Sequence, residues 1–179
     1  MTSSNKPKYL ADEVVDDVLD EKIRALLTTC FTKPQDAVFQ KQRYFREPYP
    51  HRWVIEDGHG NFVAHVGVHD KIVQAGKKFY RIAGIAEVCV HPDHRGQGLV
   101  RTMLRQIHRW LTRQGFDFAV LFGDPKVYAS SGYGCVNNLF HDTEDNAGRT
   151  RRKKIAAMVK PLSNKPWPTS KVHLPGPTF

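Results

Sequence analysis

The stretch Ile85-Ala-Glu-Val-Cys-Val-His-Pro-Asp-His-Arg-Gly-Gln-Gly-Leu-Val100 decides the fold of this 179-residue chain. It begins as an apolar strand, turns at Pro92, and passes through a glycine loop into a long amphipathic helix. Glycine has no Cβ, so Gly96 and Gly98 allow backbone N–H groups to come close to a ligand. The N-terminus of the following helix adds unpaired N–H groups and the positive end of its dipole. The junction therefore predicts a phosphate-binding site.

Hydrophobic periodicity on either side of this stretch predicts an α/β fold. Apolar residues at helical spacing predict helices over 17–31 and 98–114, a shorter helix over 35–46, and another that ends at Ser131. The proline-rich tail 165–179 is expected along the surface. We expect a mixed, mostly antiparallel sheet flanked by helices. Apolar runs predict its strands over 9–15, 51–56, 61–74, 78–83, 85–91, 116–122, 133–139 and 155–162.

Length and composition limit the class of protein. A chain of 179 residues with 40% hydrophobic residues suits one soluble domain over 1–179. No apolar run approaches the roughly 20 residues that span a bilayer, and the N-terminus lacks the apolar segment of a secretory signal. The three cysteines, Cys30, Cys89 and Cys135, form no CxxC pair, so reduced thiols in a cytoplasmic protein are expected.

The formal charge of +9 is unevenly distributed. Residues 1–90 hold 13 basic and 12 acidic side chains, whereas residues 91–179 hold 14 basic and 6 acidic ones. The excess thus lies on and after the glycine loop, where an anionic ligand would require it. Arg149-Thr-Arg-Arg-Lys-Lys154 is a dense basic run. We expect it to be a charged loop before the strand at 155, and contact with nucleic acid is the less favoured interpretation.

Two motifs, in a consistent order, carry a family resemblance. Arg95-Gly-Gln-Gly-Leu-Val100 opens a helix after a valine-rich strand, and Tyr128-Ala-Ser-Ser-Gly-Tyr133 follows a later strand and a Gly-Asp-Pro turn. Together they resemble the acyl-CoA loop and the Tyr-x-x-x-Gly-(Phe/Tyr) segment of the GNAT N-acetyltransferase superfamily, over roughly residues 51–140. Val100 departs from the Gly or Ala of that pattern. The preceding Glu87 and the Val-Arg spacing are similar to the aminoglycoside 2'-N-acetyltransferase branch.

The resemblance implies a GNAT-like sheet with an acyl-CoA slot between two central strands, and acetyl-CoA as the acyl donor. Val88, Cys89 and Val90 would pair through their backbone with the pantetheine amides, as an added strand does. An N–H near Val88 or Val90 would polarise the thioester carbonyl. The family's pyrophosphate cradle falls on Arg95, Gly96, Gln97, Gly98, Leu99, Val100 and Arg101.

Two further residues are candidates for proton transfer. Tyr128 matches the family's general acid, which would return a proton to the departing CoA thiolate. Glu87 is the candidate base that takes a proton from the amine, through water. Simpler roles stay open: Tyr128 as a core aromatic residue, Glu87 as a residue that faces solvent or pairs with Arg81, and Cys89 as a buried core thiol.

The leading hypothesis is an acetyl-CoA-dependent N-acetyltransferase that acetylates a primary amine of a small molecule by direct attack in a ternary complex. A protein lysine or N-terminal acetyltransferase is the alternative enzyme. A basic nucleic-acid-binding module with a regulatory CoA site is the alternative from another class. We expect no membrane contact, and a homodimer is left open. No metal is expected, because His65 and His69 lie about 13 Å apart along a strand, too far to share one ion.

Overall fold

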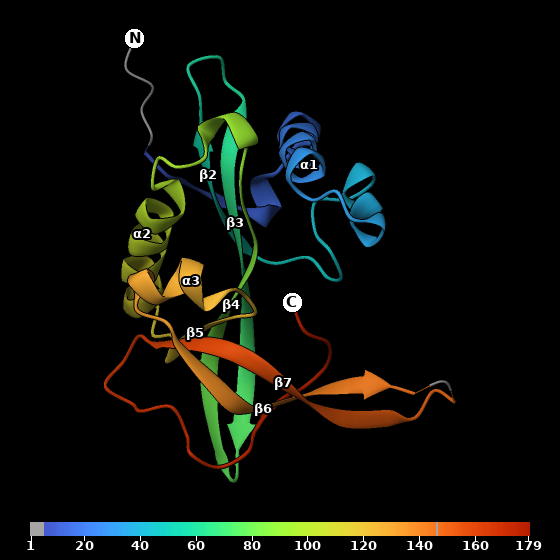
Figure 1. Ribbon diagram of the computed structural model, residues 1–179, viewed down its shortest axis with the longest axis vertical. Coiled ribbons are helices and arrows are strands. Elements are labelled where there is room, and N and C mark those ends of the chain that lie inside the picture. Colours follow the sequence, from blue (N-terminus) through green and yellow to red (C-terminus); the bar gives the residue numbers. More distant parts are fainter. Residues whose placement is uncertain (1–5, 146) are drawn as a thin grey trace. The chain divides into compact units, whose positions relative to one another are not determined.

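The computed structural model describes residues 6–145 and 147–179 (Figure 1). The chain divides into two compact units. Two strands and one helix run from one unit into the other: β3 (Phe62–Ala75), β4 (Lys78–Val90) and α2 (Leu99–Arg113). The units are Met1–His69 with Ile85–Ile107, called unit 1, and Asp70–Gly84 with His108–Phe179, called unit 2.

Unit 1 is built on antiparallel strands. β1 (Lys8–Ala11) pairs with β2 (His51–Glu56), and β2 pairs with the first half of β3. Helix α1 (Asp17–Cys30) begins where the Asp16 carboxylate accepts a hydrogen bond from Leu19 N at 2.9 Å. The helix packs its apolar face against the strands, and the shared core consists of Ile23, Leu26, Leu27, Phe39, Val54, Phe62 and Cys89.

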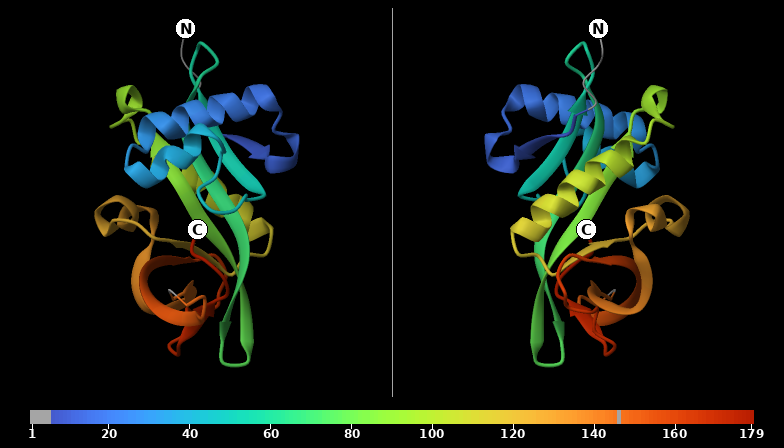
Figure 2. Two further views of the ribbon diagram at one scale, coloured as in Figure 1. Left: turned by 90° about the vertical axis from the view of Figure 1, so that its right-hand side faces the viewer. Right: turned by 90° about the vertical axis from the view of Figure 1, so that its left-hand side faces the viewer.

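Unit 2 contains a mixed set of strands. β4 pairs in parallel with β5 (Phe118–Leu121), and β5 pairs antiparallel with β7 (Thr150–Pro161). β7 pairs antiparallel with β6 (Gly134–Glu144), and β6 pairs in parallel with β8 (Val172–Leu174). Figure 2 shows the β3–β4 hairpin, and Figure 1 shows the long β6–β7 hairpin of this unit from the side. Its core includes Val73, Ile82, Phe118, Val120, Leu139, Val159, Val172 and Leu174. The predicted mixed, mostly antiparallel sheet with flanking helices is confirmed.

The remaining elements are short helices. Among the described residues, no helix is both long and apolar enough to cross a membrane. The short helices are η1 (Asp12–Val14), η2 (Pro34–Gln40), η3 (Pro92–His94), α3 (Pro125–Tyr128) and η4 (Ala129–Ser131).

Several predicted boundaries are wrong. The segments 78–83 and 85–91 form one strand, β4, because the chain passes through Gly84 without a turn. The segment 35–46 holds only the 3-10 helix η2, and the first strand ends at Ala11 where η1 begins.

The largest differences lie near the C-terminus. The basic run 149–154, expected as a loop, lies almost entirely in β7, because β6 supplies ladder partners as far as Glu144. The tail, expected along the surface, returns to the sheet as β8, where Val172 and Leu174 are buried. Long-range strand pairing overrides local polarity in both segments.

Candidate active site

The glycine loop leads from β4 through η3 into α2. Gly96 has a φ of 75° and Gly98 a φ of 69°, both in the left-handed region that favours glycine. A Cβ built on either glycine would meet no atom within 4 Å, so both lie beside open space. The first hydrogen bond of α2 joins Thr102 N to Gly98 O at 3.1 Å. The N–H groups of residues 99–101 therefore lack acceptors within the helix, as a phosphate cradle requires.

Side chains around the loop hold it in place. The Arg95 Nε donates to the Val90 carbonyl at 3.2 Å, which ties the arginine to the end of β4. Leu99 is buried and anchors the start of α2, whereas Arg95 and Arg101 are exposed. Val100, which departs from the family pattern, is half-buried in the first turn of the helix. The branched side chain is thus partly covered by the surrounding protein.

Glu87 lies within β4 in an unusual backbone conformation. Its φ is 42°, and it is the one residue other than glycine with a positive φ in the described part of the chain. Such a conformation costs on the order of 1–3 kcal/mol, so the surrounding structure must enforce it. The Glu87 carbonyl oxygen lies 2.9 Å from His65 Nδ1. Because a carbonyl oxygen only accepts, Nδ1 carries the proton of this imidazole.

The Glu87 carboxyl group is buried and has a raised pKa. Its Oε1 accepts a hydrogen bond from Phe45 N at 3.2 Å, and its Oε2 is buried without a partner among the described residues. Burial raises the pKa of Glu87 to about 7, although the Phe45 N–H, the Tyr49 hydroxyl and Arg52 act in the opposite direction. A base with a pKa near neutrality can exchange protons efficiently at physiological pH. The suggested pairing of Glu87 with Arg81 is not found, since Arg81 pairs with Asp70 at 2.6 Å.

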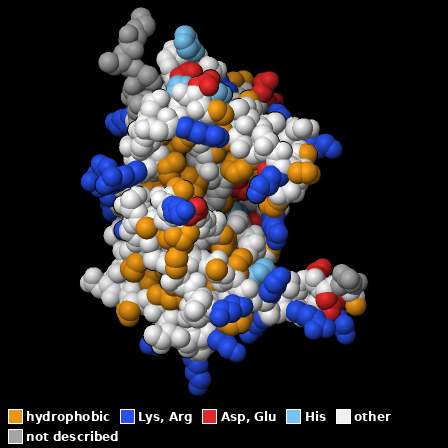
Figure 3. Space-filling model, in the orientation of Figure 1, with side chains coloured by type: hydrophobic (Ala, Val, Ile, Leu, Met, Phe, Trp, Pro, Cys, Tyr) orange, Lys and Arg blue, Asp and Glu red, His pale blue; other side chains and the backbone are white. Residues whose placement is uncertain are grey.

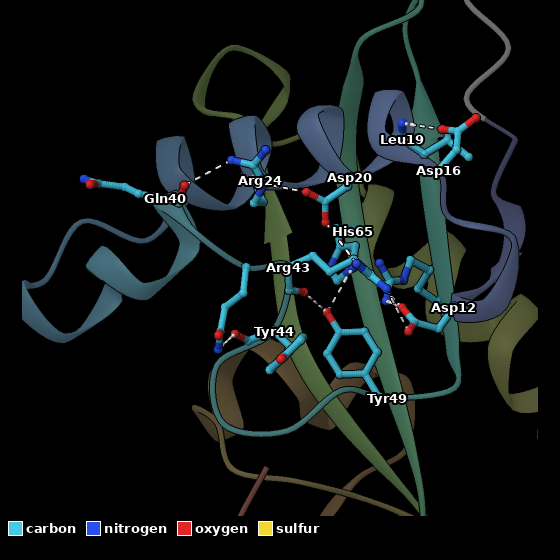
Figure 4. Close-up of polar contacts among 12 residues, drawn as sticks. Asp12, Asp16, Leu19, Asp20, Arg24, Gln40, Arg43, Tyr44, Tyr49 and His65 are labelled. Atoms are coloured by element: carbon cyan, nitrogen blue, oxygen red, sulfur yellow. Dashed lines mark hydrogen bonds and ion pairs between the residues drawn. The ribbon is translucent and has the colours of Figure 1, made fainter.

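A buried polar network surrounds Tyr49 in unit 1. Arg52 has no solvent exposure, forms an ion pair with Asp12, and lies 4.9 Å from the centre of the Tyr49 ring. Figure 4 shows Arg43 between Asp12 and Asp20, which it binds at 2.8 Å and 3.1 Å. The Tyr49 hydroxyl donates to the Arg43 carbonyl at 3.0 Å. Asp12 and Asp20 therefore already form ion pairs with arginines within the fold.

Cys89 lies in the strand that is expected to bind the donor. It is buried in the core of unit 1, with Cys30 packed against the same cluster. A hydrogen bond with Cys89, together with Arg95, lowers the pKa of Cys30 to about 7, and the same contact and burial raise the pKa of Cys89. Cys89 is thus a protonated thiol at neutral pH, which suits a core residue.

Tyr128 lies at the end of α3 in unit 2. The Asp124 carboxylate caps this helix by accepting a hydrogen bond from Lys126 N at 2.9 Å. The ring of Tyr128 packs on the backbone of Gly123, where a Cβ would come within 2.4 Å of Tyr128 Cε2. On another side it meets the Tyr133 ring in a T-shaped contact, with the centroids 6.1 Å apart. Gly123 and Tyr133 thus limit the positions of the phenol.

Tyr133 is itself held by a neutral partner. Its hydroxyl lies 2.8 Å from His108 Nε2, and both side chains are buried. Burial, aided by Lys160, lowers the pKa of His108 to about 4, and burial raises the pKa of Tyr133. Both groups are therefore uncharged at neutral pH, and the pair braces Tyr128 without adding charge.

The candidate residues fall into two groups. Glu87, Val88–Val90 and Arg95–Arg101 all belong to unit 1, and Tyr128 belongs to unit 2. Sequence reasoning missed the residues that act on the pKa of Glu87, namely Phe45, Tyr49 and Arg52. Each of them is more than 30 residues away from Glu87 in the sequence, and none stands in a motif. The described residues hold no group of three or more His, Cys, Asp or Glu side chains that could bind a metal ion.

Comparison with known proteins identifies one family. Residues 15–136 match the model of the acetyltransferase (GNAT) domain. N-acetyltransferase Eis from Mycobacterium tuberculosis is 31% identical over 97 residues, which cover 51% of this chain and 24% of that protein. The chain therefore matches about a quarter of the length of this relative.

Solved structures share the fold. The GNAT family N-acetyltransferase YhbS from Escherichia coli, in complex with CoA, has a TM-score of 0.65 at 19% identity and covers 94% of this chain and 89% of its own. A GNAT family acetyltransferase from Brucella melitensis in complex with acetyl-CoA has a TM-score of 0.53 at 17% identity. That match covers 73% of this chain and 84% of the other.

Proposed function

The chain belongs to the GNAT acetyltransferase family, and we propose that it transfers an acetyl group from acetyl-CoA to a primary amine of a small molecule. The predicted fold class, enzyme class and acyl donor are confirmed at the level of the family. One observation carries the proposal: a helix N-terminus with open backbone donors follows a strand in which Glu87, at a positive φ, holds a carboxyl group with a pKa of about 7. The proposed domain covers residues 1–179 and includes both units.

Donor binding is assigned to the end of β4 and the start of α2. The N–H groups of residues 97–100 and the Arg95 guanidinium would bind the pyrophosphate, and Arg101 in the first helical turn would add a second cation. The backbone of Val88–Val90 would pair with the pantetheine amides. The exposed, left-handed Gly96 and Gly98 support this assignment, because a larger residue there would be strained and would cover the donors.

The reaction proceeds by direct attack. The amine nitrogen attacks the thioester carbonyl carbon, a C–N bond forms, and the C–S bond then breaks to release CoA. An N–H of Val88 or Val90 stabilises the oxyanion. Glu87 accepts the amine proton through a water molecule, and Tyr128 donates its phenolic proton to the thiolate of CoA.

The charges around Glu87 bear on the acceptor. The Glu87 Oε2 is buried without a hydrogen-bond partner among the described residues, so the amine proton would reach it through a water molecule. The acids Asp12 and Asp20 are held by Arg43, which leaves them little capacity to attract a polycation. A primary amine of a small molecule that is not a polycation fits these surroundings.

We also propose a cytoplasmic location. The support is chemical: Cys30, Cys89 and Cys135 are free thiols, and the reducing cytoplasm preserves such thiols. The low pKa of Cys30 would make it vulnerable in an oxidising compartment.

Calorimetric titration of acetyl-CoA tests the donor site. Arg95→Ala should weaken binding about 10-fold, and Gly98→Glu should weaken it about 100-fold, since it adds strain and a repelling charge at the cradle. Arg105→Ala, on the exposed face of α2, is the matched control and should bind normally. Unchanged affinity in both loop variants would disprove the phosphate assignment.

Turnover of a model amine tests the proton transfers. Glu87→Gln should lower kcat about 100-fold and remove the rise of kcat with pH near 7, and Tyr128→Phe should lower kcat with acetyl-CoA affinity preserved. An unchanged rate in either variant would remove that residue from the mechanism.

A further inference from the structure

The net charge of the chain lies entirely in unit 2. Unit 1 contains 12 basic and 12 acidic side chains, whereas unit 2 contains 15 basic and 6 acidic ones. The glycine loop belongs to unit 1, so the donor site does not account for the surplus. Unit 2 therefore carries nine unbalanced positive charges that the proposed reaction leaves unexplained.

The surplus of positive charge is densest on the β6–β7 hairpin. Figure 3 shows lysine and arginine side chains along the projecting arm at the lower right. Five of the six residues in Arg149–Lys154 are basic, and all six are exposed. The side chains of Arg149, Arg151 and Arg152 are 64–70% exposed although each has an acidic neighbour. Lys153 and Lys154 make no ion pair within the described residues. Cations therefore cover the distal part of the hairpin.

Two of the three acids on the hairpin, Asp142 and Asp145, serve the hairpin itself, and the third, Glu144, is exposed. Asp145 closes the turn by accepting hydrogen bonds from Ala147 N and Arg149 N, both at 3.0 Å. Asp142 binds His173 at 2.9 Å and Gly176 N at 3.1 Å, which fastens the hairpin to the C-terminal segment. These bonds lower the pKa of both carboxyl groups, so they remain charged and occupied. These two carboxylates therefore stabilise the conformation of the hairpin more than they neutralise the positive charge on its outer surface.

Strand geometry places cations on both faces of the arm. His141 pairs with Lys153 and Thr143 with Arg151, while Phe140 pairs with Lys154 and Asp142 with Arg152. Because side chains alternate along a strand, Arg151 and Lys153 share one face and Arg152 and Lys154 share the other. A groove of about 490 Å³ lies on the second face, and its lining includes Phe140, Arg152, Lys171 and His173.

We propose that the β6–β7 hairpin docks onto double-stranded DNA by binding its phosphates. A two-stranded ribbon fits the major groove of B-form DNA, whose width of about 12 Å admits it, and cations on both faces then meet the backbones on either side. Three of the five cations of the run are arginines, which bind phosphate in a bidentate manner. Exposed aromatic residues, which single-strand binding would use, are lacking in the run 149–154.

Two other roles make different predictions. Charged residues at an unpaired strand edge prevent aggregation, which requires no ligand. An acidic protein would also be attracted, but it would not depend on the groove geometry of a duplex. The order of affinities for different polyanions separates these roles from DNA docking.

The test is the salt dependence of binding to a short labelled DNA duplex of mixed sequence, measured by fluorescence anisotropy on the full chain. The variant replaces Arg151, Arg152, Lys153 and Lys154 with Gln. Its slope of log affinity against log salt should be smaller in magnitude by about 3 to 4, since each phosphate contact contributes roughly 0.9. The matched control, Lys41, Arg105, Arg109 and Arg113 replaced with Gln, removes the same charge from other exposed positions and should keep the slope.

Two comparisons complete the experiment. Duplex RNA of the same sequence and polyglutamate should bind more weakly than duplex DNA, because neither offers a wide major groove. Equal binding of DNA and polyglutamate, or equal slopes in the hairpin variant and the control, would overturn the proposal. Acetyl transfer measured without DNA should be the same in the hairpin variant and the wild type, so this test is independent of the proposed reaction.

Discussion

Unit 1 carries equal numbers of acidic and basic side chains and buries several of them against one another, whereas unit 2 holds the whole net charge and exposes most of it. The proposed pyrophosphate site lies in the neutral unit. It relies on backbone N–H groups at a helix N-terminus, aided by Arg95. An anion site of this kind needs no surplus of basic side chains, so net charge is a poor guide to where the cofactor binds.

The charge count along the sequence led to the opposite expectation. The loop and the basic run both lie in the second half of the chain, so the charge count along the sequence favours the loop as the place of the surplus. In the fold they belong to different units, because residues 85–107 join the N-terminal part in unit 1 and the run joins unit 2. Position along the chain therefore does not predict position in the fold. We assign the surplus of positive charge to a partner other than the cofactor.

The largest expected effect follows from the buried charges of unit 1. Asp12→Asn leaves Arg52 without its carboxylate in a site with no solvent exposure, and burial already lowers the pKa of that arginine. Removing one partner of a buried pair costs about 3–5 kcal/mol, so the urea midpoint should fall strongly. Arg152→Gln is the matched change in unit 2, where the pair with Asp142 is 3.8 Å long and largely exposed.

Arg152→Gln should leave the urea midpoint almost unchanged, because exposed ion pairs contribute little to stability. A similar loss in both variants would show that the two units do not differ in how they use charge.

The network around Arg52 also shows the limit of sequence reasoning. The loop, α2 and the Tyr128 segment were predictable because each is a local pattern of a few residues. Asp12 and Arg52 are 40 residues apart, and Phe45 reaches Glu87 across 42 residues through a backbone N–H that no side-chain pattern reveals. The strand from Thr150 was hidden for a related reason, since charged residues favour strands only when a partner such as β6 is present.

The next effect concerns the pH dependence of stability, which should have opposite signs in the two units. Burial raises the pKa of Glu87 from 4.5 to about 7, so the folded chain binds this proton more tightly than the unfolded chain. The contribution of Glu87 to the free energy of unfolding is complete below about pH 4.5 and is lost as the pH rises through about 7. The total change is about 3 kcal/mol. Glu87→Gln should therefore gain stability over the wild type between about pH 5 and pH 8.5 in urea titrations.

Asp142 of unit 2 supplies the reverse case. The hydrogen bond to His173, with that from Gly176, lowers its pKa, so its contribution is present above the unfolded pKa of about 4 and is lost on acidification. Asp142→Asn should be destabilised at neutral pH and should approach the wild type as the pH falls. If the stability difference from the wild type changed in the same direction with pH in both variants, the contrast between the units would not hold for titratable groups.

The smallest effect is expected at the uncharged pair of unit 2. Tyr133→Phe keeps the ring that contacts Tyr128 and removes the hydroxyl 2.8 Å from His108 Nε2. The loss of one neutral hydrogen bond is worth about 1 kcal/mol, so kcat should fall about 5-fold as Tyr128 loosens. Acetyl-CoA affinity should not change, because the loop in unit 1 is untouched. Tyr80→Phe, at a tyrosine that packs on Phe118, is the control.

The pH dependence of this loss separates bracing from proton transfer. Since burial lowers the pKa of His108 to about 4, the pair stays neutral over the range in which the enzyme would act, and the 5-fold loss should be the same at about pH 6 and pH 9. A loss confined to one end of that range would mean that His108 exchanges protons during the reaction. A uniform loss would mean that unit 2, despite its surplus of positive charge, positions its proposed proton donor, Tyr128, through contacts that carry no charge.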